Sequence, residues 1–183
     1  QNDWSSGSVA PFSAAKTAFT NYVASRNPDP IEVGKLYYQF QHGDVDFFVL
    51  DTRSQRSQNS ATDNATKTML GSSQKENLKG WLWGSTAKFK FMVSSVPWNK
   101  QATTDNDGWK GFLTERTEIF DFIKTNHIEG VVLLSGDQHW TGVFNLDATY
   151  GLYEFSPTPL GIANRELPSD ATIGQDDVLF LYG

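Results

Sequence analysis

An aspartate and a histidine follow directly on a short apolar stretch of the chain. Residues 131–135 (VVLLS) read as a strand with both faces covered, and Gly136 ends it before Asp137 and His139. In open α/β sheets, ligands bind beyond the carboxyl ends of the strands. Carboxylate oxygen and imidazole nitrogen together suit zinc, iron and manganese. We therefore predict that Asp137 and His139 are ligands of a hydrolytic metal site.

Two ligands are fewer than such a site needs, since zinc or iron usually takes at least three from the protein. The chain has three histidines in all. His127 follows a predicted helix, where a cation is favoured, and His42 lies in a predicted turn. A second interpretation stays open, in which Asp137 is a turn cap and His139 is an ordinary surface histidine.

A second polar cluster ends the predicted strand 45–50. Asp51-Thr52-Arg53 lies there, so Arg53 is expected near the same crevice, where a guanidinium matches the planar oxygens of a phosphate. An Arg–Asp pair at the strand end is an equally good interpretation. Trp109, in a later polar loop, is a candidate for the mouth of a pocket, although core packing is the more common position for a tryptophan.

Other chemistries lack their motifs. Ser135 is a weak nucleophile candidate because it belongs to a strand and no Gly-x-Ser-x-Gly elbow is present. Neither the Gly-x-x-x-x-Gly-Lys phosphate loop nor the Gly-x-Gly-x-x-Gly dinucleotide motif occurs. The chain has no cysteine, which excludes disulfides, Cys-ligated zinc and thiol catalysis.

The composition is that of a packed domain. The length of 183 residues suffices for one domain, and 38% hydrophobic residues favour a core over disorder. The net charge of −6 offers no basic surface for nucleic acid. The longest apolar runs are too short to span a bilayer.

The elements that must position these residues alternate between helix and strand. Strands 36–40 and 45–50 form a predicted hairpin, and strands 140–146 and 151–155 alternate like antiparallel partners. Residues 178–182 read as a strand without a partner, and both ends of the chain look cut. Further strands are predicted at 89–96 and 131–135, and helices at 11–23, 72–83 and 113–126.

Two of these helices have a predicted cap, and two polar loops separate the elements. Ser72 and Thr114 are predicted caps of their helices. The polar segments 54–68 and 99–110 are predicted loops, the first on the surface. The order of elements predicts an α/β fold in which helices flank a layered sheet.

Three segments resemble the PhoD-like alkaline phosphatase/phosphodiesterase family of metallophosphatases. Residues 47–54 (FFVLDTRS), with Arg56, are similar to that family's "FFxLDTRSxR" strand. Residues 69–74 (MLGSSQ) are similar to its "MLGxxQ" helix entry, and residues 133–139 (LLSGDQH) to its "GDxH" metal motif. The segment Asp107-Gly108-Trp109 resembles the family's tryptophan-containing loop.

The resemblance implies a layered metallophosphatase-like sandwich, with central mixed β-sheets flanked by helices and incomplete at both ends. Residues 1–183 would be the C-terminal part of a single catalytic domain. Asn2-Asp3-Trp4 resembles the segment that follows the family's "DDHE" motif. That motif and the upstream Asp and Cys ligand motifs are not in this chain, so the missing N-terminal half of the domain is an expected partner.

The resemblance also implies hydrolysis of phosphate monoesters or diesters by a secreted, periplasmic or extracellular enzyme. Asp137 and His139 would be metal ligands, Arg53 a contact for the phosphate, and the metals iron and calcium, with zinc or manganese as alternatives. A non-catalytic binding or structural module that keeps the sheet is the alternative function. A carbohydrate-binding β-domain, suggested by the aromatic residues, leaves the Asp-x-His motif unexplained.

Overall fold

The protein is described by a computed structural model that covers residues 9–100, 102, 106–146, 149–157, 161 and 178–182. Its centre is one seven-stranded sheet with the strand order β1-β2-β3-β4-β6-β5-β7. The strands are β1 (Tyr38–His42), β2 (Val45–Val49), β3 (Phe89–Val93), β4 (Val131–Leu134), β5 (Thr141–Leu146), β6 (Leu152–Ser156) and β7 (Val178–Tyr182).

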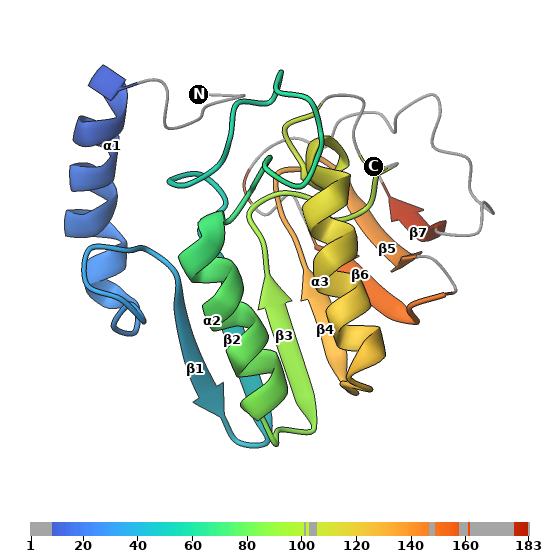
Figure 1. The fold of residues 1–183 in the computed structure, drawn as a ribbon. Coiled ribbons are helices and arrows are strands. Elements are labelled where there is room, and N and C mark those ends of the chain that lie inside the picture. Colours follow the sequence, from blue (N-terminus) through green and yellow to red (C-terminus); the bar gives the residue numbers. More distant parts are fainter. Residues whose placement is uncertain are drawn as a thin grey trace.

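Helices flank this sheet unevenly. Figure 1 shows α2 (Gly71–Gly84) and α3 (Leu113–Thr125) side by side over one face, which we call the covered face, and α1 (Val9–Tyr22) beside β1. Two short 3-10 helices, Ala24–Arg26 and Trp109–Phe112, follow α1 and precede α3. Within the described residues, no helix has the length and hydropathy that a bilayer crossing requires.

The strands β2, β3, β4 and β6 run parallel, and β1 and β5 run antiparallel to their neighbours. Helix α2 connects β2 to β3 and helix α3 connects β3 to β4, so the two helices lie on the same face. The predicted α/β fold with a layered sheet and flanking helices is thereby confirmed. The carboxyl ends of β2, β3 and β4 meet at one edge of the sheet.

The core lies between the covered face and the two helices. Phe48, Met92 and Leu133 stand in one cross-strand row and are fully buried. Leu78 of α2 and Phe120 of α3 are buried above them because each helix places its apolar residues on one side. Burial of side chains of this size stabilises the fold by about 1.5–3 kcal/mol each.

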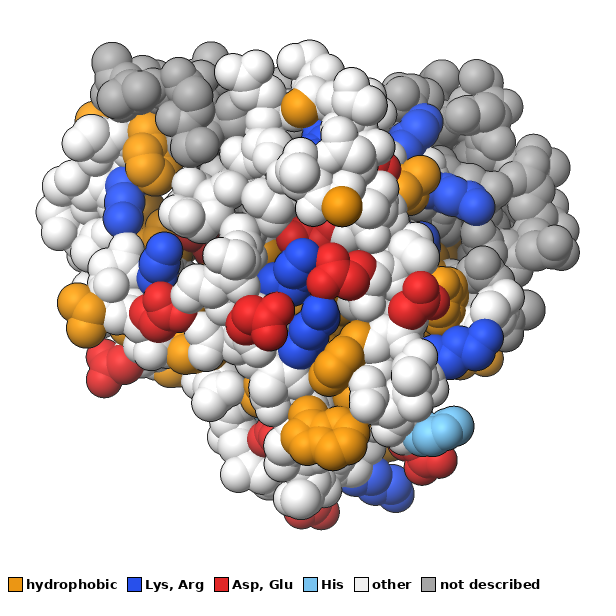
Figure 2. Space-filling view, viewed as in Figure 1, with side chains coloured by type: hydrophobic (Ala, Val, Ile, Leu, Met, Phe, Trp, Pro, Cys, Tyr) orange, Lys and Arg blue, Asp and Glu red, His pale blue; other side chains and the backbone are white. Residues whose placement is uncertain are grey.

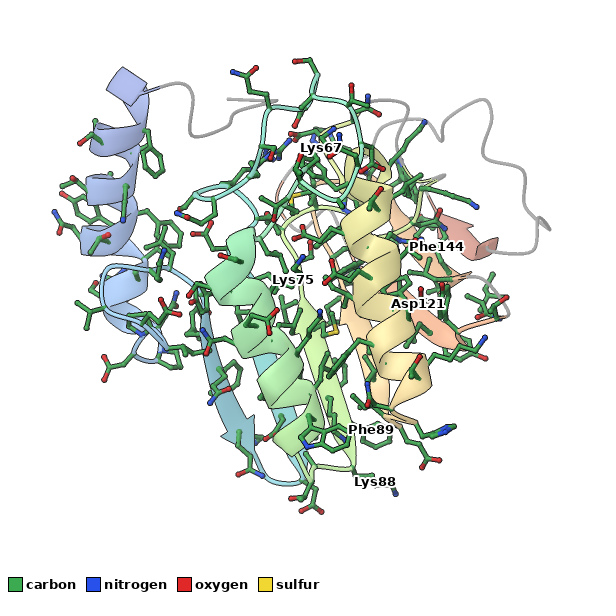
Figure 3. All side chains as sticks on the ribbon, in the orientation of Figure 1. Lys67, Lys75, Lys88, Phe89, Asp121 and Phe144 are labelled. Atoms are coloured by element: carbon green, nitrogen blue, oxygen red, sulfur yellow. The ribbon has the colours of Figure 1, made fainter. Side chains whose placement is uncertain are left out.

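Charged residues hold the outer sides of the two helices together. Lys75 and Lys79 of α2 each lie 2.7 Å from a carboxylate oxygen of Glu118 on α3. Figure 2 shows this mixture of basic and acidic side chains at the centre of the view, and Figure 3 shows Lys75 between the helices. The solvent side of the helical layer is therefore polar.

The opposite face of the sheet, which we call the open face, is apolar. The register aligns Phe40, Phe47, Phe91, Val132 and Tyr153 across five strands. The ring centroids of Phe40 and Phe47 lie 4.6 Å apart, and those of Phe47 and Phe91 lie 5.1 Å apart. Phe40 is 38% exposed and Tyr153 is 46% exposed. Among the described elements, no pair of helices covers this row in the way that α2 and α3 cover the other face.

Helix α1 approaches one corner of the open face without closing it. A cavity of about 590 Å³ separates Phe12 and Phe19 of the helix from Tyr38 and Val49 of the sheet. The space is lined mainly by apolar side chains.

Several local predictions were wrong. Residues 178–182 are not without a partner, because β7 pairs antiparallel with β5. Ser72 does not cap α2, since the hydroxyl of Thr68 accepts the Gly71 N–H at 2.7 Å instead. Thr114 is not the cap of α3, because the helix begins at Leu113. The Thr114 N–H donates to the carboxylate of Asp63 at 3.1 Å.

The segment 54–68 is only partly a surface loop. Arg56 and Lys67 are buried within it, and the Ser57 N–H donates to the carbonyl of Thr68 at 2.8 Å. Long polar side chains that turn inward anchor this segment. Its polar composition alone did not indicate that these side chains are buried.

Candidate active site

The two predicted polar clusters lie beyond one edge of the sheet. Val49, Val93 and Leu134 align in the register, so the chain leaves β2, β3 and β4 at the same level. The hydroxyls of Thr52 and Ser95 are 2.5 Å apart, and this hydrogen bond joins the segment that follows β2 to the segment that follows β3. The parallel topology thus directs the segments after β2 and β4 to one side of the sheet.

Asp51 shapes the exit from β2. Its Oδ1 accepts the N–H of Arg53 at 3.0 Å and the N–H of Ser54 at 2.9 Å, which folds the chain into a turn. The Asp51 backbone is in turn bound by Gln74 of α2. The Gln74 amide accepts the Asp51 N–H at 2.8 Å and donates to the Asp51 carbonyl at 2.9 Å. The DTRS and MLGSSQ motifs are therefore the two halves of one contact.

The turn directs Arg53 toward Asp107. Nη1 and Nη2 of Arg53 donate to Oδ1 and Oδ2 of Asp107 at 2.7 and 2.8 Å. The Arg53 side chain remains 30% exposed. The structure shows Arg53 paired with an aspartate far along the chain, and its predicted contact with a phosphate stays a prediction.

A second arginine binds the same carboxylate from the protein interior. Arg56, whose side chain is fully buried, lies 2.9 Å from Oδ1 of Asp107 and donates to the Asp107 carbonyl at 3.2 Å. Burial by itself raises the pKa of Asp107. The hydrogen bond and charge of Arg53, the charge of Arg56 and a hydrogen bond from Asn59 outweigh burial and lower that pKa from 3.8 to about 2. Asp107 is therefore ionised at any physiological pH.

Asn59 and Lys67 extend this network. Asn59 donates to Asp107 at 3.3 Å, and the Lys67 ammonium donates to the Asn59 carbonyl at 2.9 Å and lies 4.5 Å from the ring centroid of Phe112. Burial and the nearby charge of Arg56 lower the pKa of Lys67, while Asp63 opposes them. Figure 3 shows Lys67 in the loop above α2 and α3. Asn59 and Lys67 were not predicted as part of the site, because the sequence of a polar loop contains nothing that marks which side chains turn inward.

Asp137 stands in an unusual backbone conformation. Its φ of 76° lies in the left-handed region, which aspartate tolerates better than most residues. Asp137 is exposed, His139 is half-buried, and Trp140 after them is buried. Strained backbone of this kind is concentrated at functional sites.

Asp137 and His139 fit a hydrolytic metal in kind but not in number. Carboxylate oxygen and imidazole nitrogen are suitable donors. Within the described residues, however, no group of three or more His, Cys, Asp or Glu side chains could hold a metal ion. Asp137 and His139 are thus two candidate ligands, fewer than a tight site requires, and the Asn2-Asp3-Trp4 segment lies outside the described residues.

Trp109 lies in the core. It is fully buried, its ring stacks on Trp98 with centroids 4.2 Å apart, and its Nε1 donates to the hydroxyl of Ser94 at 3.2 Å. A substrate contact at a pocket mouth stays a prediction that this buried position does not support.

Comparisons with known proteins agree on one family. The model of the PhoD-like phosphatase family matches residues 2–173. Alkaline phosphatase D of Bacillus subtilis (strain 168) is 29% identical over an alignment of 134 residues, and the match covers 63% of this chain and 23% of that protein. A solved structure of PhoD matches with a TM-score of 0.65 and 27% identity, over 79% of this chain and 33% of that one.

A more distant likeness concerns the fold alone. The purple acid phosphatase PPD1 from yellow lupin (Lupinus luteus) seeds matches with a TM-score of 0.55 and 11% identity, over 82% of this chain and 27% of that one. The chain spans 23% of the Bacillus relative and 33% of the solved PhoD chain.

Proposed function

The chain belongs to the PhoD-like phosphatase family, and from this we propose that it supplies the C-terminal part of the active site of a metal-dependent phosphoesterase. The observation that carries the proposal is the parallel alignment of β2, β3 and β4, which brings the DTRS and GDQH segments to one edge of the sheet. The substrates would be phosphate monoesters or diesters.

In this proposal, Asp137 and His139 hold a metal ion, with iron and calcium expected and zinc or manganese as alternatives. When bound, such an ion polarises a phosphoryl oxygen and lowers the pKa of bound water. The exposed carboxylate of Asp137 and the half-buried imidazole of His139 would bind it from the turn after β4. The remaining ligands would come from outside the described residues.

Arg53 would bind the phosphate of the substrate. Its side chain is 30% exposed, and its two donors already form the two-pronged geometry that a phosphate accepts. A phosphate that replaced Asp107 at Arg53 would leave that carboxylate bound to Arg56. The buried arginine therefore allows Arg53 to exchange partners without leaving Asp107 unpaired.

The activity is tested on the polypeptide that carries this chain, with p-nitrophenyl phosphate and bis-p-nitrophenyl phosphate. We expect a chelator to abolish hydrolysis, added metal to restore it, and Asp137→Ala or His139→Ala to lower kcat by about 100-fold or more. Asp121→Asn, on α3 in Figure 3, and His127→Asn are matched controls that should retain activity. Activity that ignores both the chelator and Asp137→Ala would contradict the proposal.

We also propose that an upstream part of the same domain covers the open face. The row from Phe40 to Tyr153 contains no charged residue, and extended apolar patches of this kind mark interaction surfaces. Co-expression of the chain with the upstream segment should give a co-purifying complex that no longer binds an apolar dye. Intact mass spectrometry that finds only the 183-residue chain, without partner or metal, would favour the alternative of a non-catalytic module.

The proposed location is outside the cytoplasm, in the periplasm or the medium, as the resemblance implies. Fractionation of the source cells, with detection of the chain by antibody, tests this location. Detection in the cytoplasmic fraction alone would contradict it.

A further inference from the structure

A carboxylate is buried in the core directly below the candidate active site. Glu154 of β6 is fully buried and aligns with Leu133 of β4 and Phe144 of β5. Both of these neighbours are apolar and buried, so an apolar side chain would suit the position. Removal of a carboxylate from water costs several kcal/mol unless partners compensate for it, which calls for a reason beyond packing.

The partners of Glu154 come from two strand exits. Its Oε1 accepts the Trp98 N–H and its Oε2 accepts the Asn99 N–H, both at 2.8 Å, from the segment after β3. Its Oε1 also accepts the hydroxyl of Ser135, which follows β4. Burial raises the pKa of Glu154, and these three hydrogen bonds together with the charge of Arg116 oppose the rise. One carboxylate thus joins three strands at the edge where the motifs lie.

Ser135 is held on two sides by β6. Its hydroxyl donates to Glu154, and its N–H donates to the carbonyl of Phe155 at 3.0 Å. The next two residues are Gly136 and Asp137, which has the left-handed φ. A fixed Ser135 therefore determines where the turn that carries Asp137 begins.

We propose that Glu154 is a positioning residue that fixes residues 135–139 through Ser135 and so places Asp137 and His139 for metal binding. This inference rests on the proposed metal role of those two residues. Groups that orient metal ligands typically change metal affinity by about 10- to 100-fold when they are replaced.

Two substitutions separate positioning from stability. Ser135→Ala removes only the hydroxyl, whereas Glu154→Gln replaces one acceptor oxygen with an NH₂ group that must face a backbone N–H. Ser135→Thr keeps the hydroxyl and serves as the conservative variant. Glu115→Gln is a matched control, because Glu115 is also buried and accepts one hydroxyl and two backbone N–H groups, from Thr68, Met69 and Leu70.

The polypeptide that carries the chain is measured without metal by amide hydrogen exchange of residues 135–139, and then with Mn²⁺ by paramagnetic resonance. We expect Ser135→Ala and Glu154→Gln to speed exchange in this segment and to weaken Mn²⁺ binding by about 10- to 100-fold. Ser135→Thr should preserve both values. Glu115→Gln should lower Tm while leaving exchange in residues 135–139 and Mn²⁺ affinity unchanged.

Unchanged exchange of residues 135–139 in Ser135→Ala would overturn the positioning role, whether or not metal binds and even if Glu154→Gln does not fold. Faster exchange with unchanged Mn²⁺ affinity would overturn the link to the metal. A wild-type protein that binds no Mn²⁺ while Ser135→Ala speeds exchange would count against the proposed metal role and support the positioning.

Discussion

The guanidinium of Arg53 and the carboxylate of Asp107 are joined by two parallel hydrogen bonds of 2.7 and 2.8 Å, although the residues lie 54 positions apart in the chain. This pair fastens the exit of β2 to the loop that precedes α3. Because Arg56 binds the same carboxylate from the interior, Asp107 is the common anchor of both arginines. Stability and the proposed phosphate contact therefore depend on one aspartate.

Replacement of Asp107 by Asn should destabilise the protein strongly. The change leaves the fully buried Arg56 side chain without its compensating charge, and loss of one partner of a buried pair typically costs about 3–5 kcal/mol. Urea unfolding at neutral pH measures the loss. Glu118→Gln removes a partner of Lys75 and Lys79 on the surface and should cost less than about 1 kcal/mol. Equal losses in both variants would contradict the anchor role of Asp107.

The Arg53–Asp107 pair predicts that part of the free energy of unfolding is lost in acid. The folded-state pKa of Asp107 is lowered from 3.8 to about 2, so its contribution is fully present above about pH 4 and is lost as the pH falls toward 2. The shift corresponds to roughly 2 kcal/mol. The free energy of unfolding of wild-type protein and Asp107→Asn should therefore converge by about that amount between pH 5 and pH 2. A difference that stays constant over this range would show that Asp107 does not titrate there.

Gln74 should be a stability determinant out of proportion to its size. Its amide satisfies both backbone groups of Asp51, and a buried polar group left unsatisfied costs about 1–3 kcal/mol. We expect Gln74→Ala to lower the free energy of unfolding by about 3 kcal/mol in a denaturant titration. Gln39→Ala, at an exposed position of β1, should change it by less than about 0.5 kcal/mol. A small loss for Gln74→Ala would mean that water replaces the amide.

Gly130 and Gly151 both have a positive φ, but replacing each of them with alanine should lower the stability by different amounts. A Cβ at Gly130, where φ is 73°, would lie 2.1 Å from the Lys88 carbonyl oxygen, whereas at Gly151, where φ is 62°, no atom lies within 4 Å. Gly151→Ala should cost about 1–2 kcal/mol for the backbone alone. Gly130→Ala must also displace the chain before β3, so its Tm should fall further. Similar Tm values for both variants would contradict the close approach at Gly130.

The sequence by itself predicted the elements that local pattern specifies. The helix at 113–126 and the strand at 131–135 match α3 and β4 within a residue, because their apolar periodicity reflects one buried side. The hairpin of β1 and β2 was predicted from its turn residues, but β1 begins and ends two residues later than predicted, so His42 lies in the strand and not in the turn. The short motifs also sufficed to indicate the family, since their residues recur in a fixed order.

Only the tertiary structure decided which distant residues meet. Asp107 as the partner of Arg53, Gln74 as the support of Asp51, and Glu154 below Ser135 join segments that no local pattern connects. The partner of a side chain depends on how whole elements pack together. The sequence does not show whether a polar residue in a loop faces water or the core. For that reason the sequence left Trp109 between a pocket mouth and the core, and only the fold placed it in the core.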